Sequence, residues 1–87
     1  MNPYVPERAP GDVVPTCLYR LFADDGTLLY VGITEKGLRR QFEHARDHVW
    51  FDDVSNLAVQ HFPTRDLARA AEVRAIAYEG PLYNIER

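Results

Sequence analysis

The pattern of hydrophobic and polar positions predicts a β-hairpin early in the chain. Thr16–Ala23 and Leu28–Thr34 are both rich in strand-forming side chains, and Asp24-Asp25-Gly26-Thr27 lies between them. The Asp-Gly step suits a tight turn that requires positive φ. Gly32 lies inside the second strand and has no side chain to pack, which indicates a bulge or a close approach of the backbone to another group.

A helix is expected next, over residues 37–48, because apolar side chains recur there at helical spacing. The members of this stripe are Leu38, Phe42, Ala45 and Val49. Residues 50–53 are expected to form a loop or a single turn, with Trp50 and Phe51 sealing the core.

The second half of the chain predicts one more strand and one more helix. Residues 54–62 alternate apolar and polar side chains and end at Pro63, which is typical of a strand. Residues 65–79 read as a helix that Thr64 caps and that Gly80-Pro81 ends. The tail that follows is expected to fold back, because Leu82, Tyr83 and Ile85 carry too much apolar surface to leave in water.

The order strand, strand, helix, strand, helix predicts a small α/β sandwich: a three-stranded sheet, mixed or antiparallel, flanked by helices. Residues 16–87 would form this single domain. Residues 1–15 hold four of the six prolines and are expected to be an extended Pro-rich N-terminal arm.

Composition narrows the classes of function. The chain has 87 residues and a formal net charge of −3, so its overall field opposes encounter with nucleic acid. Cys17 is the only cysteine, which excludes an internal disulfide or a multi-cysteine zinc site and favours a cytoplasmic protein. The chain contains no apolar run of membrane-spanning length, about 18 residues, so no membrane partner is expected.

One carboxylate does not fit a plain amphipathic helix. Leu67, Ala68, Ala71, Ala75, Ile76 and Tyr78 fall on one half of the predicted second helix, and Glu72 falls within that same half. A carboxylate on the core side must be paired, protonated or bound to a cation. An ion pair with Arg20 or Arg40 is the simplest alternative to a metal site.

Two further features are unremarkable alone. Arg40 and His44 are neighbours at i and i+4, opposite the apolar stripe of their helix, where an ordinary solvated surface is the alternative. Tyr19 and Tyr30 lie in the two hairpin strands, on either side of the turn, where sheet packing would suffice to explain them.

Together these residues resemble the signature of the GIY-YIG nuclease superfamily. Cys17-Leu18-Tyr19 and Tyr30-Val31-Gly32 are similar to its paired tripeptides, with Cys17 where glycine is usual, which we interpret as a packing variation. The features that follow in the family's order and spacing are Arg40, His44, Glu72 and a Tyr83-Asn84 step after a proline. The resemblance spans roughly residues 16–85.

The resemblance implies metal-dependent hydrolysis of phosphodiester bonds. Glu72 would hold one Mg²⁺ or Mn²⁺, Arg40 would bind the phosphate as charge builds in the transition state, and Tyr19 would act as general base with help from His44. Tyr30 would orient the water or the phosphate, and Asn84 would position the substrate or the glutamate. Gly32 would keep the backbone clear of the DNA strand.

The resemblance also implies DNA as the partner, with RNA left open because phosphate contacts do not distinguish the two. Ile33 stands where some members carry lysine, so Lys36 would supply that phosphate contact, beside Arg39. The basic strip expected around the site is Arg20, Lys36, Arg39, Arg40 and Arg46, extended by Arg65, Arg69 and Arg74.

The negative net charge predicts weak, salt-sensitive DNA binding and a separate targeting protein or domain. Two alternatives remain open at this point. One is a nucleic-acid or protein-binding module of the same fold that is catalytically weak or inert. The other is an RNA-acting toxin or defence nuclease.

Overall fold

The computed structural model describes residues 14–84, and at residues 40, 44 and 45 it describes the backbone alone. The elements follow in the order β1 (Thr16–Ala23), β2 (Leu28–Thr34), α1 (Leu38–Ala45), the 3-10 turn η1 (Phe51–Asp53), β3 (Val54–Phe62) and α2 (Arg65–Glu79). Of the predicted N-terminal arm, residues 1–13 lie outside the described part of the chain.

The sheet has three antiparallel strands in the order β2-β1-β3, which places β1 at the centre and β2 at an edge. The predicted three-stranded sheet is therefore confirmed, and of the two arrangements left open, mixed or antiparallel, the sheet is antiparallel. The hairpin turn is also confirmed: Gly26 has φ of 91°, and the backbone N–H of Thr27 donates to Asp25 Oδ1 at 3.0 Å.

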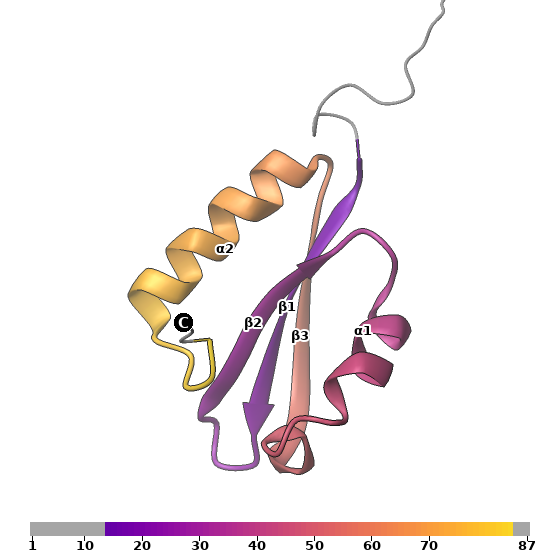
Figure 1. Ribbon diagram of the computed structural model, residues 1–87. Coiled ribbons are helices and arrows are strands. Elements are labelled where there is room, and N and C mark those ends of the chain that lie inside the picture. The colour runs from indigo at the N-terminus through magenta and orange to yellow at the C-terminus, as the bar shows by residue number, and fades with distance from the viewer. Residues whose placement is uncertain (1–13, 85–87) are drawn as a thin grey trace, which may run out of the picture.

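The two faces of the sheet are covered by different helices. Leu18 and Val31 pack with Ala75 of α2, whereas Tyr19 and Leu21 pack with Trp50 on the other face. Figure 1 shows α2 and α1 on the two sides of the sheet. Adjacent residues of β1 therefore belong to different cores, as the pleat of a strand requires.

Helix α2 buries small side chains against the sheet. Ala68 and Ala75 are buried, whereas Leu67 is 51% exposed and Tyr78 is 84% exposed. The prediction that Leu67 and Tyr78 face the core is therefore wrong. Alanines allow the helix backbone to lie close to the strands, and the larger side chains are left at the margins of the contact.

Helix α1 ends at Ala45, so the prediction that it continues to His48 is wrong. Val49, expected on its apolar stripe, is 91% exposed. The chain leaves the helix and turns back so that Trp50 reaches the sheet, where it is 7% exposed and stacks on Tyr30 with the ring centroids 5.3 Å apart. Burying an indole removes far more apolar surface from water than burying a valine does.

The C-terminal tail folds back along β2, as predicted, but the expected reason is wrong, because Leu82 and Tyr83 remain 52% and 41% exposed. Thr64 accepts a hydrogen bond from the backbone N–H of Leu67, and Gly80 ends α2 in the left-handed conformation with φ of 63°. The backbone N–H groups of Leu82 and Tyr83 then donate to carbonyls of β2 at 3.1 and 2.9 Å. Ile85 lies outside the described residues. Within residues 14–84, no helix is both long enough and apolar enough to cross a lipid bilayer.

Candidate active site

Tyr19 and Gly32 are direct partners across β1 and β2, and the position of the Tyr19 ring accounts for the glycine at residue 32. A Cβ atom at residue 32 would lie 2.5 Å from the hydroxyl oxygen of Tyr19 and 2.6 Å from its Cζ. The ring of Tyr19 therefore lies over Gly32 and occupies the space that any side chain would need. The glycine makes room for a tyrosine, whereas we had expected it to make room for a DNA strand.

The environment of Tyr19 holds its phenol protonated. The side chain is 5% exposed, and burial is the largest cause that raises its pKa well above the ordinary value. Tyr30 and the negative charge of Glu72 raise this pKa further. Tyr19, from the central strand, and Glu72, from α2, are therefore within electrostatic reach of each other.

Gln41 of α1 is a member of this site that sequence reasoning missed. The Tyr19 hydroxyl donates to Gln41 Oε1 at 3.5 Å, and Gln41 Nε2 donates to Thr34 Oγ1 at 3.4 Å. Both bonds are long and therefore weak, and the first of them is the one that involves the phenol. The one available signal was that Gln41 lies three residues after Leu38, toward the sheet-facing side of the helix.

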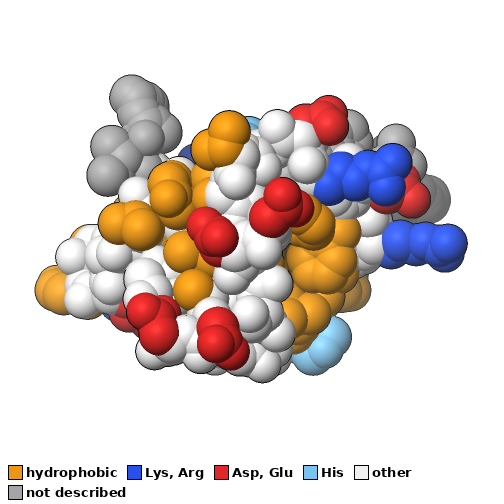
Figure 2. Space-filling model, turned by 90° about the horizontal axis from the view of Figure 1, so that it is seen from below, with side chains coloured by type: hydrophobic (Ala, Val, Ile, Leu, Met, Phe, Trp, Pro, Cys, Tyr) orange, Lys and Arg blue, Asp and Glu red, His pale blue; other side chains and the backbone are white. Residues whose placement is uncertain are grey.

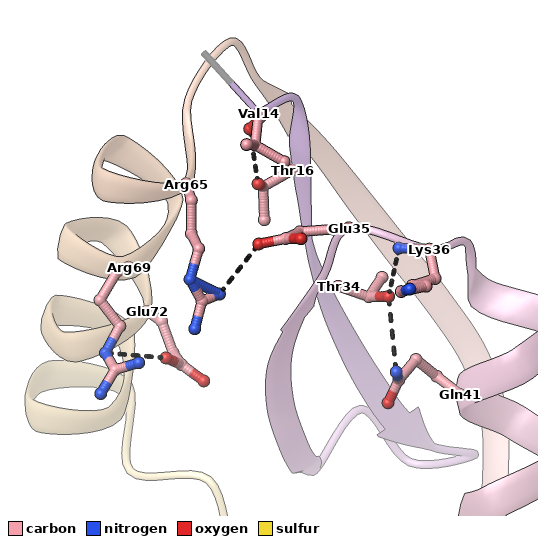
Figure 3. A network of polar contacts seen from close by, with 9 residues as sticks. All are labelled: Val14, Thr16, Thr34, Glu35, Lys36, Gln41, Arg65, Arg69 and Glu72. Atoms are coloured by element: carbon pink, nitrogen blue, oxygen red, sulfur yellow. Dashed lines mark hydrogen bonds and ion pairs between the residues drawn. The ribbon is translucent and has the colours of Figure 1, made fainter. Parts of the chain in front are cut away.

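Glu72 is half-buried and close to arginines of its own helix. Its side chain is 18% exposed, and its Oε1 lies 3.8 Å from Nε of Arg69. Burial raises the pKa of this carboxyl, while the charges of Arg69 and Arg65 lower it. In Figure 3 the side chain points from α2 toward the strands. The predicted carboxylate on the inner half of α2 is thus present at the edge of the sheet.

Of the two ion-pair partners expected for Glu72 from the sequence, Arg20 is wrong, and the side chain of Arg40 lies outside the described part of the chain. Arg20 binds Glu79 instead, with nitrogen–oxygen distances of 2.8 and 2.9 Å, and also donates to Gln60 Oε1 at 2.6 Å. Arg20 belongs to the α2-facing side of β1, opposite to Tyr19, since neighbouring residues of a strand point to opposite faces. It is therefore not part of a basic strip beside Tyr19.

A second carboxylate and a second arginine lie along the same edge. Arg65 Nη1 lies 3.5 Å from Glu35 Oε2, just beyond the end of β2. Arg65, Arg69 and Glu72 recur at helical spacing, so they form one polar stripe on α2. Figure 3 shows this stripe facing β2 and the segment that follows it.

The residues fit one divalent cation held by a single carboxylate. Among the described residues no group of three His, Cys, Asp or Glu side chains is placed to ligate a metal together. Glu72 offers hard oxygen donors, which Mg²⁺ and Mn²⁺ prefer, and Mg²⁺ commonly keeps several waters beside one or two carboxylates. A cation would also offset the burial of the Glu72 charge.

Tyr30 lines a small cavity next to Tyr19. The cavity measures about 80 Å³, and the other residues that line it are Leu21, Gln41, Phe42, His48 and Trp50. Trp50 forms its rigid wall, since it stacks on Tyr30 at 5.3 Å and on His48 at 5.2 Å. A cavity of this volume is large enough for a few water molecules.

The basic residues predicted on and before α1 are placed in part. Arg39 is almost fully exposed and makes a loose pair with Glu43, with 4.0 Å between nitrogen and oxygen. Lys36 is exposed, and its backbone N–H donates to Thr34 Oγ1 at 3.0 Å, which brings this lysine close to the Gln41 end of the site. The backbone of Arg40 and His44 lies in α1, and their side chains are outside the described part of the chain.

Asn84 has a defined partner other than the glutamate. Its Oδ1 accepts from the Val31 N–H at 2.7 Å, and its Nδ2 donates to the Val31 carbonyl at 2.8 Å. The side chain thus pairs with the exposed edge of β2 as another strand would. We expected Asn84 to position the substrate or Glu72; in this structure it fastens the tail to the strand that carries Tyr30 and Gly32.

Cys17 contacts β3. Its Sγ lies 3.2 Å from Nδ1 of His61, which is its partner across the β1–β3 ladder. The side chain that replaces the usual glycine therefore packs within the sheet. This geometry agrees with a packing variation at that position.

Comparison with known protein families, with curated proteins and with solved structures finds no match for this chain. The case for a function therefore depends on the residues of the site and on their arrangement.

Proposed function

We propose that this chain is a divalent-metal-dependent endonuclease of the GIY-YIG kind that hydrolyses phosphodiester bonds in DNA. One observation carries the proposal: Tyr19 of the central strand lies across Gly32, within electrostatic reach of Glu72 on α2. The tyrosine, the glycine and the glutamate stand at positions where the family signature has the same residue types.

Each residue then has a role that its position supports. Glu72 would hold one Mg²⁺ or Mn²⁺ ion, which when bound supplies Lewis-acid stabilisation of the leaving oxygen. Tyr19 would take the proton of the attacking water as the phenolate, after its own proton has left to solvent, and Tyr30 would hold that water in the adjoining cavity. Burial is the largest cause that raises the pKa of Tyr19 and the charge of Glu72 is the third, so a cation that neutralises Glu72 would lower this pKa only in part.

Arginine and histidine of α1 complete the proposed site. Arg40 would bind the phosphate as negative charge develops, since a guanidinium matches phosphate oxygens in two hydrogen bonds. His44 would add positive field near the phenol. Lys36 and Arg39 would contact neighbouring phosphates, and Asn84 would act indirectly by fixing the edge of β2.

The experiment is nicking of supercoiled plasmid, branched DNA and RNA in the presence of Mg²⁺ or Mn²⁺. Glu72→Gln and Tyr19→Phe should each lower the rate by about 10²-fold or more. Asp66→Asn removes an exposed carboxylate from the same helix and should leave the rate within a factor of two or so, which makes it the matched control. Wild-type protein that is inactive on every substrate with both metals would sink the proposal.

A binding module without catalysis is the second candidate, and the Arg69–Glu72 contact favours it. A carboxylate that already has a cation 3.8 Å away has less need of a metal. Calorimetric titration with Mn²⁺ separates the two functions. Binding that Glu72→Gln abolishes supports the nuclease, whereas DNA binding that is unchanged by this variant, with no binding of Mn²⁺, supports the module.

A further inference from the structure

Two ion pairs that involve α2 differ in the distance between their charged groups. Arg20 and Glu79 meet through two short hydrogen bonds of 2.8 and 2.9 Å. Arg69 and Glu72 are 3.8 Å apart, beyond hydrogen-bond distance, so only electrostatic attraction joins them. The first pair fixes the helix to the sheet, and the second leaves both of its members able to take other partners.

The two members of the loose pair are unequally held. The side chain of Glu72 is 18% exposed, whereas that of Arg69 is 61% exposed. Glu72 is therefore the more buried of the two, and most of the Arg69 side chain is already in solvent. Any exchange of partner would therefore move Arg69 and leave Glu72 in place.

We propose that Arg69 is an exchangeable partner of Glu72: it neutralises the carboxylate while no metal is bound, and it turns to a substrate phosphate once a divalent cation takes its place. This inference rests on the proposed function, because it takes Glu72 as the metal ligand. Arg69 would then delay metal binding in the free protein and strengthen DNA binding in the loaded one.

The neighbouring arginine provides an internal comparison. Arg65 lies one turn earlier on the same stripe and also lowers the pKa of Glu72, but its side chain pairs with Glu35 at 3.5 Å. Arg74 is on the same helix and is exposed, and it lines the groove beside Arg20 on the other side of α2. Competition with the metal should therefore decrease from Arg69 to Arg65 to Arg74.

The test is calorimetric titration of the whole protein with Mn²⁺ in the absence of DNA. Arg69→Gln should tighten Mn²⁺ binding by about two- to fivefold, the range that a partly exposed ion pair is worth. Arg65→Gln should have a smaller effect, and Arg69→Lys should restore the wild-type affinity in part. Arg74→Gln makes the same charge change and should leave the affinity unchanged.

DNA affinity measured with Ca²⁺, which permits binding in place of cleavage, gives the second readout. Arg69→Gln should weaken DNA binding more with the cation than without it, and should reduce the salt slope by about one with the cation bound. A purely structural role for Arg69 would change both affinities alike, and circular dichroism would show that loss of fold.

The outcomes separate this inference from the proposed function. If Glu72-dependent Mn²⁺ binding occurs but Arg69→Gln does not tighten it, the exchange is wrong and the nuclease proposal survives. If no Mn²⁺ binding depends on Glu72, both fail together.

Discussion

The ring of Tyr19 covers Gly32 so closely that each residue determines what the other can be. The atoms nearest to a Cβ at residue 32 are the hydroxyl oxygen and Cζ of Tyr19, the end of the side chain that the proposed chemistry uses. A buried ring cannot move aside as a flexible surface chain can. The Tyr19 hydroxyl is therefore positioned by the backbone of the neighbouring strand.

Gly32→Ala should consequently displace the Tyr19 ring. We expect a loss of about 1–3 kcal/mol in the free energy of unfolding, typical of an overpacked core, together with loss of nicking. Urea unfolding and the plasmid assay measure the two effects. In a Tyr19→Phe background the penalty should shrink but persist, because Cζ alone would still lie 2.6 Å from the new methyl group. An equal penalty in both backgrounds would contradict this geometry.

The raised pKa of Tyr19 predicts how stability changes at alkaline pH. Below the ordinary tyrosine value, about 10, the phenol is protonated in the native and the unfolded chain. Above it the unfolded chain loses the proton that the native protein keeps, so stability falls as the pH rises toward the native pKa. Urea unfolding measured between neutral and alkaline pH should show this slope in the wild type.

Tyr19→Phe should make that alkaline slope shallower. Tyr78→Phe is the matched control because its ring is 84% exposed. If the two variants gave the same slope as the wild type, Tyr19 would not be the group responsible.

At the scale of the elements, local signals were sufficient wherever they were strong. β1, β2, β3 and α2 begin and end as the sequence predicts, since Asp25-Gly26, Pro63-Thr64 and Gly80-Pro81 each stop one element and allow the next. The predicted end of α1 was wrong. Val49 continues the helical spacing of apolar residues and favours a longer helix, but Trp50 can stack on Tyr30 only if the chain turns before it. Tertiary packing prevailed over the local pattern.

The candidate site was predictable in its motif residues and not in their partners. Tyr19 and Glu72 stand out by type and position, because a tyrosine in a hairpin strand and a carboxylate on an apolar helix face can be recognised from the sequence alone. Gln41 could not be identified as the partner of Tyr19, since that contact depends on how α1 lies against the sheet. The contact of Arg69 with Glu72 is different: it follows from the i, i+3 spacing within α2, and we had looked for the partner of Glu72 on other elements. The pairing of Asn84 with Val31 depends likewise on the tail returning to β2.

Asn84→Ala tests what holds the tail to the edge of β2. The variant leaves the N–H and the carbonyl of Val31 without their side-chain partner, so we expect a loss of about 1–3 kcal/mol in the free energy of unfolding. Asn84→Asp should retain part of this stability, because a carboxylate still accepts from the N–H. Asn56→Ala, at an exposed position of β3, is the control. Lost nicking with unchanged stability would instead indicate a direct role in the site.

At the scale of the whole molecule, acidic side chains gather at the end of the sheet that holds the hairpin turn. A groove of about 540 Å³ there is lined in part by four aspartates: Asp24, Asp25, Asp52 and Asp53. Figure 2 shows this end, with acidic side chains set around hydrophobic ones. Arg65 and Arg69 lie instead along α2, and Lys36 follows the other end of β2. Under the proposed function, this acidic groove would slow the approach of DNA by electrostatic repulsion without contacting it.

Removing two of these charges should therefore accelerate DNA binding while leaving catalysis alone. Asp52→Asn combined with Asp53→Asn changes the net charge by +2, from −3 to −1. At low salt we expect the association rate to rise about two- to threefold and the dissociation rate to stay the same, since neither side chain lines the site. At high salt the Debye length becomes short compared with the distance between these aspartates and the bound DNA, so the gain should disappear.

Stopped-flow anisotropy with labelled DNA measures both rates, and the double Asp→Glu variant, which keeps the charge, is the control. A gain that persists at high salt, or that appears in the dissociation rate, would mean that these aspartates meet the DNA directly.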